Sequence, residues 1–428
     1  MKKITAILTI LLFHALLADA QEKTLKEQAV EKFEKEHYHE AIALLEQAVI
    51  ETPDDAEIYF YLGWFNHYRA YDSRLLAGYN FAYSQKIFNY LDKAISLNPQ
   101  LRDAIYFYEA ECGAVADKAM RNYDVEKLRY FYQKAYEKGA FPPWRIEHGK
   151  NFMNTCDTNA ILFTGGDADF NICMYLQLHQ NYRTDLTVIP LGFLGRPWYI
   201  KFLKTGLGNV IKKININLTD EQILDIRPFK WKTTDVYIAV SEEIKTALNL
   251  EQNFQFKWTV EPDLVQIEGK EVKERTYLSP HRAMLLQIVE DNFKERPIYF
   301  SFFAYRTAFG GLTPYFRYCG MTSQLLPVET KDTDKLNDIP KLEALFQTEN
   351  FINFPTVKTD DIPRVSQCVY SYYYIFMALT HHYKQTNQAE KLKKIIELYK
   401  THIAIGYDEA YEADVLEWAE ETLKRIIE

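Results

Sequence analysis

The sequence predicts an α + α/β fold: an N-terminal helical array, a domain built on a mixed or mostly parallel sheet, and C-terminal helices. Three observations support this prediction. Apolar residues recur at helical spacing through residues 21–140, short apolar runs alternate with helical segments over residues 145–330, and helical spacing returns over residues 365–428. Strands that alternate with helices are typical of crossover connections, so parallel pairing is expected.

The first twenty residues have the pattern of a secretory signal peptide. Met1-Lys2-Lys3 is basic, residues 4–17 are almost wholly apolar, and Ala18-Asp19-Ala20 is a small-x-small cleavage site. We expect cleavage between Ala20 and Gln21 and a periplasmic or secreted protein. No later stretch reaches the length of apolar sequence that spans a bilayer, so no transmembrane segment is expected after cleavage.

Charge and cysteine content exclude several classes of protein. The 428 residues carry a formal net charge of −9 without a basic block or stripe, so nucleic acid is not an expected partner. The five cysteines are odd in number and widely spaced, and none forms a Cys-x-x-Cys pair. We therefore expect most of them to be small buried apolar groups, and their disulfide state is not predicted.

Residues 21–140 contain a repeated pattern. The same offsets of four, three and five residues separate a small or apolar residue, a leucine, an alanine and a proline in two copies: Ala41, Leu45, Ala48 and Pro53, then Ile87, Leu91, Ala94 and Pro99. A small residue where paired helices cross and a proline after the second helix resemble the tetratricopeptide repeat. The resemblance implies a groove that binds a protein or peptide. The alternative is that the repeats brace the next domain.

The α/β domain is expected to follow Phe141-Pro142-Pro143-Trp144, which breaks the helical pattern. Residues 161–164 predict a buried strand, residues 170–178 a helix, and residues 186–189 a strand, which together make a βαβ unit. Strands are further predicted over residues 236–240, 254–260, 297–303 and 324–328, and a helix over 280–293.

The end of the chain is predicted to be helical again. Residues 331–364 are expected to form a linking segment with one helix over 339–346. Residues 365–428 then predict three helices, separated by polar breaks near Asn387 and Gly406.

Asp167 and Asp169 are the leading candidates for a site, because they follow the first predicted strand at the edge where α/β sheets bind ligands. Two carboxylates at this spacing are able to bind one divalent cation. The alternative is that they serve turn geometry and helix capping. Arg196 lies in the loop after the second strand, and Trp198 and Tyr199 are candidates for stacking on a sugar ring if they are exposed.

Nucleotide and hydrolase motifs are missing from the sequence. It contains no Gly-x-Gly-x-x-Gly or Walker loop, which disfavours a dinucleotide or nucleoside triphosphate. It also contains no Gly-x-Ser-x-Gly or His-Glu-x-x-His motif, which disfavours a serine hydrolase or zinc protease.

An ordered series of motifs runs through residues 155–330. The series is Gly166-Asp167-x-Asp169, Tyr175 and Gln177, Arg183-x-Asp185, Trp198-Tyr199-Ile200, Arg296-Pro297-Ile298-Tyr299-Phe300, and Gly320 ahead of Leu326-Pro327-Val328. It resembles the soluble extracytoplasmic portion of bacterial membrane proteins classed as protein O-mannosyltransferase-like glycosyltransferases.

Two departures limit what this resemblance implies. Between the two aspartates the family typically has Asn, whereas this chain has Ala168. Soon after them the family has a proline, whereas this chain has Asn171-Ile172-Cys173. The membrane portion that holds the lipid-linked donor in that family has no counterpart in this sequence. The resemblance therefore implies an accessory domain that contacts the same acceptor proteins or glycans, and transferase activity does not carry over.

Together these features predict a scaffold or accessory factor for envelope glycan or glycoprotein handling, which binds a protein and is neither catalytic nor dependent on a cofactor. The alternative is an enzyme or sugar-binding protein that uses the Asp167/Asp169 loop, with a divalent cation. A ligand site would respond to metal or sugar nucleotide and lose that response in Asp167→Asn or Asp169→Asn. The identity of the partner and the oligomeric state are not predicted.

Overall fold

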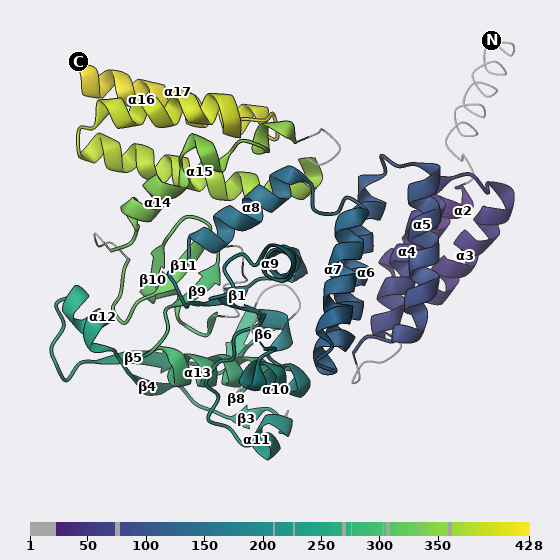
Figure 1. Cartoon of the computed structure of the whole chain (residues 1–428), viewed down its shortest axis with the longest axis horizontal. Coiled ribbons are helices and arrows are strands. Elements are labelled where there is room, and N and C mark those ends of the chain that lie inside the picture. The colour runs from purple at the N-terminus through teal and green to yellow at the C-terminus, as the bar shows by residue number, and fades with distance from the viewer. Residues whose placement is uncertain are drawn as a thin grey trace, which may run out of the picture. The chain divides into compact units, whose positions relative to one another are not determined.

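The structure, a computed structural model, describes residues 23–72, 78–208, 210–225, 227–267, 271–274, 276–302, 304, 309–331, 333, 335–357 and 362–428. The predicted signal peptide and its cleavage site lie outside these residues. The chain divides into two compact units, residues 1–114 and 115–428, and each is described by itself (Figure 1). Over the described residues, every helix is too short or too polar to cross a membrane.

Unit 1 is a stack of helices that contact one another in chain order. It contains α2 (Leu25–Glu34), α3 (Tyr38–Glu51), α4 (Ala56–Asp72), α5 (Ser84–Leu97) and the first part of α6 (Arg102–Arg121). The N-terminus of α2 is closed by a capping box between Thr24 and Glu27, which satisfies two backbone N–H groups of its first turn.

The residues of the repeated pattern form the contacts between these helices. Ala41, Leu45, Leu91 and Ala94 are fully or almost fully buried. A Cβ atom built on Gly63 of α4 would lie 2.6 Å from Cδ2 of Leu91 on α5, so any side chain at this position would require the buried Leu91 to shift. The predicted helical array is thus confirmed, whereas its assignment to the tetratricopeptide repeat stays a prediction.

Unit 2 is built on a five-stranded sheet in the order β10-β11-β9-β1-β2 (Figure 1). The strands are β1 (Ile161–Thr164), β2 (Thr187–Pro190), β9 (Ile298–Ser301), β10 (Phe316–Tyr318) and β11 (Thr322–Leu325). The central strand β1 pairs in parallel with both β2 and β9, and β11 pairs antiparallel with β9. All residues of β1, β2 and β9 are buried, as expected for parallel strands with apolar sequences.

Helices surround this sheet. Helix α9 (Asp167–Gln180) crosses from β1 to β2, which confirms the predicted βαβ unit. The other helices of this part are α7 (Val125–Glu137), α8 (Pro143–Asn154), α10 (Pro197–Thr205), α11 (Asp220–Leu224), α12 (Glu242–Ala247) and α13 (Pro280–Asn292). Most of α9 is buried, because α7 and α8 pack on it from the side away from the sheet.

The remaining strands form two-stranded ladders outside the main sheet. They are β3 (Phe229–Lys230) with β8 (Tyr277–Leu278), β4 (Thr234–Ala239) with β5 (Gln255–Val260), and β6 (Leu264–Ile267) with β7 (Glu271–Glu274). Side chains of β5 alternate between buried and exposed along the strand. Such alternation leaves one face in solvent, which fits a peripheral hairpin better than the centre of a covered sheet.

The chain ends in α14 (Ile339–Leu345), α15 (Ile362–Gln385), α16 (Ala389–Leu398) and α17 (Glu409–Ile427). The last three pack side by side (Figure 1). Asn387 lies between α15 and α16, and Gly406 lies between α16 and α17, at the predicted breaks. Their φ angles of 55° and 76° are in the left-handed region. All five cysteines are buried, as predicted.

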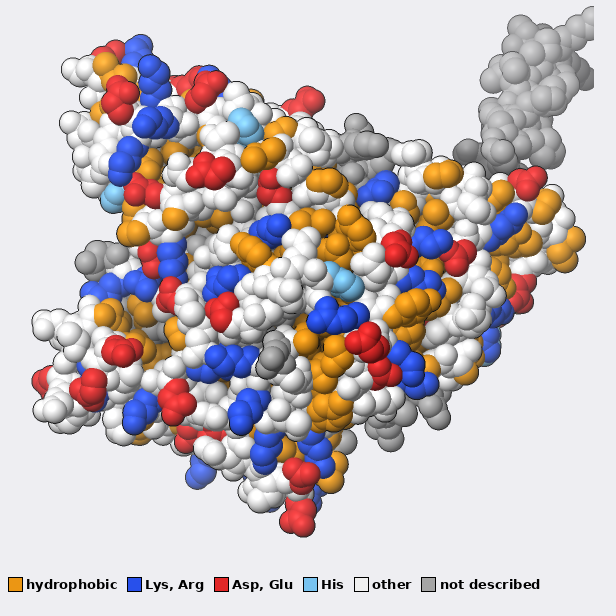
Figure 2. Space-filling view, in the orientation of Figure 1, with side chains coloured by type: hydrophobic (Ala, Val, Ile, Leu, Met, Phe, Trp, Pro, Cys, Tyr) orange, Lys and Arg blue, Asp and Glu red, His pale blue; other side chains and the backbone are white. Residues whose placement is uncertain are grey.

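Charged side chains of both signs are interspersed on the face drawn in Figure 2. No continuous basic stripe crosses the described residues of that face. This distribution agrees with the mixed charges and net charge of −9 of the sequence.

Candidate functional site

The strand order places a change of direction between β1 and β9. From β1 the chain crosses through α9 to β2 on one side, whereas from β9 it continues to β10 and β11 on the other side. In open α/β sheets such a switch point, at the carboxyl ends of the strands, is where ligands bind. We call this end of the sheet the carboxyl edge.

Asp169 is held at the carboxyl edge by the end of β9. Its Oδ2 atom accepts a hydrogen bond of 2.8 Å from Oγ of Ser301, the last residue of that strand. Burial raises the pKa of Asp169, while the hydrogen bonds from Ser301 and Gly165 and the charge of Arg145 act in the opposite direction. The structure thus connects the loop after β1 with the end of β9 through this carboxylate.

Asp167 differs from Asp169 in its environment, although only one residue separates them. It is the first residue of α9 and it is exposed. Its Oδ1 accepts a hydrogen bond of 3.0 Å from the amide of Ala168. The N-cap residue is Gly166, which has no side chain to donate or accept. Both aspartates therefore lie in the first turn, where the helix dipole favours a negative charge, and neither is the capping residue.

Thr164 ends β1 with a hydroxyl that is not satisfied. The residue is fully buried, and its Oγ1 has no hydrogen-bond partner among the described residues. A buried hydroxyl without a partner costs on the order of 1–3 kcal/mol. Thr164 is the last residue of β1, so this hydroxyl belongs to the carboxyl edge.

Arg196 forms a second cluster at this end of unit 2. Its Nη1 lies 3.0 Å from Oδ2 of Asp117, whose side chain is only 6% exposed. Burial raises the pKa of Asp117 to about 7, against the opposing charges of Arg196 and Arg121, and Asp167 raises it further. A buried carboxyl that titrates near neutrality beside a charged partner is a typical feature of functional sites.

Aromatic rings complete this second cluster. The guanidinium carbon of Arg121 lies 4.6 Å from the ring centroid of Trp198, and that of Arg196 lies 4.1 Å from the ring of Phe193. Tyr199 is 1% exposed and its hydroxyl donates to the Val188 carbonyl at 3.3 Å, so it attaches α10 to β2 and is not available to stack on a sugar. Trp198 keeps a partly exposed ring.

The described residues contain no group of three or more His, Cys, Asp or Glu side chains arranged to hold a metal ion. A divalent cation would have only Asp167 and Asp169 as protein ligands, and Asp169 already accepts from Ser301. The metal site therefore remains a prediction, and the residues present fit it poorly.

The opposite end of the sheet, which we call the amino edge, is held by two arginines. Arg183 donates to the carbonyls of Met153 at 2.8 Å and Cys156 at 3.1 Å, and it forms an ion pair of 2.9 Å with Asp185. These bonds fasten the segment before β1 to the segment before β2. The Arg183-x-Asp185 motif is accounted for by this structural role.

Arg296 makes a similar set of bonds between three segments. Its guanidinium donates to the carbonyls of Asn159 at 2.8 Å, Ala160 at 3.0 Å and Lys213 at 3.2 Å, and to Oγ1 of Thr187 at 2.9 Å. The residue is 7% exposed, so removing its side chain would take a donor from each of these acceptors in a nearly dry environment, although the Ala160 carbonyl would keep its hydrogen bond of 3.0 Å from the Thr187 amide. The arginine of the Arg296-Pro297 motif thus joins the starts of β1, β2 and β9.

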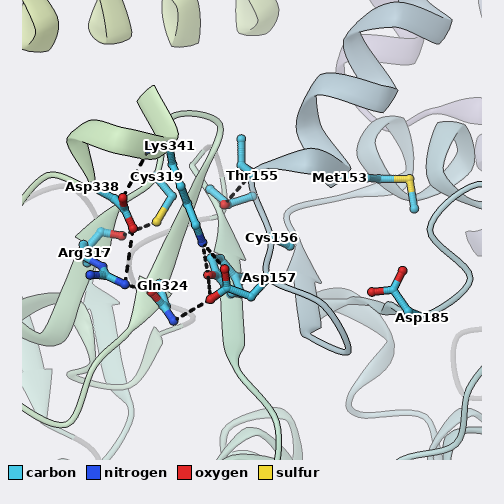
Figure 3. Close-up of polar contacts among 12 residues, drawn as sticks. Met153, Thr155, Cys156, Asp157, Asp185, Arg317, Cys319, Gln324, Asp338 and Lys341 are labelled. Carbon is cyan, nitrogen blue, oxygen red and sulfur yellow. Dashed lines mark hydrogen bonds and ion pairs between the residues drawn. The ribbon is translucent and has the colours of Figure 1, made fainter. Parts of the chain in front are cut away.

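A third network at the amino edge attaches α14 to the sheet (Figure 3). Nζ of Lys341 lies 2.6 Å from Oδ1 of Asp157. The hydroxyl of Tyr299 donates a hydrogen bond of 2.7 Å to Oδ2 of the same carboxylate. Burial favours the neutral acid, but the bonds from Lys341 and Tyr299 hold the pKa of Asp157 below its ordinary value. Gln324 adds a donor at 3.3 Å, so the carboxylate has partners on both oxygens.

Comparison with known proteins gives a match to a family profile. Residues 146–263 and 263–343 match the family profile of TMEM260-associated domain 2. The matched residues include all five strands of the main sheet, the arginines of the amino edge, and Asp167 and Asp169. No curated protein and no solved structure matches the chain.

Sequence reasoning missed part of the carboxyl edge. Asp117 and Arg121 lie in α6, a helix assigned from sequence to the repeat array, and Ser301 lies in a strand read only for its apolar character. One signal was present for Asp117: it is the acid in an otherwise alanine-rich stretch of α6, where Ala114, Ala116 and Ala119 are all buried. A charge on a buried helical face calls for a partner.

Proposed function

We propose that this protein is an exported binding protein without catalytic activity, whose helical array holds a protein partner in envelope glycan or glycoprotein handling. The observation that carries the proposal is a continuous aromatic surface on unit 1. The proposal of export rests on the basic and apolar leader of residues 1–20.

The aromatic surface comes from the first helix of each helical pair, α2, α4 and α6. It consists of Phe33, Tyr61, Trp64, Tyr68 and Phe107. Trp64 lies at its centre, with ring centroids 5.4 Å from Phe33, 5.7 Å from Phe107 and 5.9 Å from Tyr61.

These rings are not all enclosed by unit 1. Tyr68 is 45% exposed, and Phe33, Tyr61, Trp64 and Phe107 are partly exposed. Large aromatic side chains that remain accessible next to one another are typical of the central contacts of protein interfaces. In helical repeats the first helices line the groove, which is where a peptide segment binds.

Support for glycan or glycoprotein handling comes from unit 2. Its motifs resemble the soluble portion of protein O-mannosyltransferase-like glycosyltransferases, and its sheet lies within the profile match to TMEM260-associated domain 2. These two likenesses favour a role beside glycosylated or glycosylating proteins.

Site-specific photocrosslinking tests the array. With p-benzoylphenylalanine at position 68, ultraviolet light in cells of the native host is expected to give a discrete adduct, which Trp64→Ala reduces because a central aromatic contact contributes about 2 kcal/mol or more. The matched control is the same amino acid at Tyr237, which is 57% exposed on unit 2. Absence of an adduct at position 68, or the same adduct at position 237, would contradict the proposal.

A second candidate function is ligand binding at the carboxyl edge, as a metal-dependent or sugar-binding protein. It is favoured by the unsatisfied Thr164 hydroxyl and by the buried Asp117 carboxylate, which pairs with the partly exposed Arg196. We would record thermal unfolding against divalent cations, sugar nucleotides and oligosaccharides. A ligand at about 100 times its Kd would raise the Tm by roughly 5–10 °C, and Asp169→Asn would abolish the rise. A panel without any shift would eliminate this candidate.

A further inference from the structure

Unit 2 contains a cavity that the sites above do not use. Its volume is about 370 Å³, within the range of small-molecule sites, and it lies between α10, α11, α13 and the β3–β8 ladder. Its walls are mainly aliphatic, with Leu194, Ile200, Ile223, Leu278, Met284 and Leu286 among them. Leu224 and Phe229 beside it are 58% and 42% exposed, so the apolar surface continues outward.

Four polar side chains in the cavity wall already have partners within the protein. Nε1 of Trp231 donates to the Val260 carbonyl at 2.9 Å, and Oε1 of Gln222 accepts from the Thr219 amide at 2.8 Å. Nε2 of Gln287 donates to Asp291 at 2.9 Å. Asp225 accepts from the guanidinium of Arg227 at 2.7 Å.

This pairing restricts what the cavity is able to hold. A sugar, a nucleotide or a peptide backbone would bring many donors and acceptors into walls with few groups left to satisfy them, at a cost for each. A hydrocarbon chain brings none, and it gains free energy from every methylene that leaves water.

We infer that this cavity binds the hydrocarbon chain of a single-chain amphiphile with an uncharged hydrogen-bonding head. Besides Asp225, the charged residues that line the cavity are Lys230 and Glu290. Both are exposed, and they have opposite signs. A head of either charge would be attracted by one of them and repelled by the other, so its charge brings little net gain against its lost hydration, whereas a hydroxyl is able to form a hydrogen bond with either. This inference does not depend on the proposed function of unit 1.

The experiment is a chain-length series of n-alkyl β-glucosides, titrated calorimetrically into the mature protein below their micelle concentrations. From about six to ten carbons, each added methylene is expected to tighten Kd about fourfold, with a negative heat-capacity change that marks apolar burial. Glucose alone is expected not to bind. Affinity that does not change with chain length, or glucose that binds as tightly as its alkyl derivatives, overturns the inference.

A comparison of two head groups on the same hydrocarbon chain tests whether the head is uncharged. A fatty acid of equal chain length is expected to bind about tenfold more weakly than the glucoside, because its carboxylate loses hydration at an apolar cavity where repulsion by Glu290 offsets the attraction of Lys230. A fatty acid that binds more tightly than the glucoside overturns the assignment of an uncharged head.

Filling the cavity tests its location. Ala283→Phe places a ring in the wall from α13 and is expected to weaken binding at least thirtyfold, while Ala247→Phe, on exposed α12 away from the cavity, leaves Kd within twofold. If Ala283→Phe does not fold, Gln287→Trp decides, since Gln287 is partly exposed and tolerates a larger side chain more readily. Unchanged binding in a folded filling variant overturns the inference.

Discussion

Both ends of the sheet in unit 2 carry several charged residues, but the two ends differ in how completely their polar atoms are hydrogen-bonded. At the amino edge, Arg183, Arg296 and the Asp157–Lys341 pair have their charges and hydrogen-bonding atoms engaged with carbonyls, hydroxyls and carboxylates of neighbouring segments. At the carboxyl edge, the Thr164 hydroxyl has no partner among the described residues, and Asp117 and Asp169 have raised pKa values.

This difference distinguishes motif residues that stabilise the fold from motif residues that are candidates for binding a ligand. Polar residues that complete one another's hydrogen bonds stabilise the fold, and their removal leaves buried groups without partners. Polar residues that remain incompletely satisfied cost stability, and a site for ligands is one reason to keep them. By this criterion the arginine motifs serve the fold, and the residues around the β1–β9 switch point are the better candidates for function.

The largest effect is expected from Arg296→Ala. The carbonyls of residues 159, 160 and 213 and the Thr187 hydroxyl would lose this donor in a nearly dry site, and only the Ala160 carbonyl and the Thr187 hydroxyl have a further hydrogen bond described. We expect a loss of about 3–5 kcal/mol in the free energy of unfolding, measured by denaturant titration. Arg227→Ala is the control, because its pair with Asp225 is 84% exposed on the arginine side and its loss should leave the stability nearly unchanged. Equal effects in the two variants would remove the distinction drawn for the amino edge.

Asp117→Asn is expected to change the pH dependence of stability. The folded pKa of about 7 lies above the ordinary value of 3.8, so the folded protein keeps this proton after the unfolded chain has lost it. The contribution of Asp117 is thus greatest below about pH 4 and is lost as the pH rises through about 7, by at most roughly 4 kcal/mol.

The measurement is the difference in unfolding free energy between the native protein and Asp117→Asn at several pH values. Relative to the variant, the native protein should become less stable from pH 4 to pH 8. A difference that is constant with pH would show that Arg196 keeps Asp117 ionised throughout, and the carboxyl edge would then resemble the amino edge.

The smallest effect is expected from Thr164→Val. The substitution preserves the shape of the side chain and removes a hydroxyl that has no partner, so stability should rise by up to about 1 kcal/mol. Thr187→Val is the matched control at the amino edge, where the hydroxyl accepts from Arg296 and donates to the Lys212 carbonyl at 2.9 Å, and it should be destabilising. A loss of stability in Thr164→Val would mean that the hydroxyl is already satisfied.

Local patterns were sufficient to predict most elements of the fold. The apolar runs at β1 and β2 and the intervening helix gave the βαβ unit, and Asn387 and Gly406 marked the breaks between the last helices. The strands at 234–239 and 255–260 were also found, but their place outside the main sheet was not. Strand pairing depends on which segments meet in three dimensions, and the sequence pattern of a single strand does not contain that information.

The site was predictable only where its residues follow a strand directly. Asp167 and Asp169 were found because they come after β1, and Arg196 because it follows β2. Asp117 lies 79 residues before Arg196 in a helix with its own apolar pattern, and Ser301 lies 132 residues after Asp169. Contacts across such separations are created by the tertiary fold.

The long reach of Arg296 has a consequence for how the protein is made. Its bonds extend 137 residues back to Asn159 and 109 residues back to Thr187, and Tyr299 reaches 142 residues back to Asp157. During synthesis the starts of β1 and β2 therefore emerge long before the residues that join them. Contacts of high sequence separation form late, because the loop-closure entropy must be overcome first. The growing chain is consequently expected to leave the apolar strands β1 and β2 unprotected until β9 has been made, which makes this interval the period when a chaperone is most useful to it.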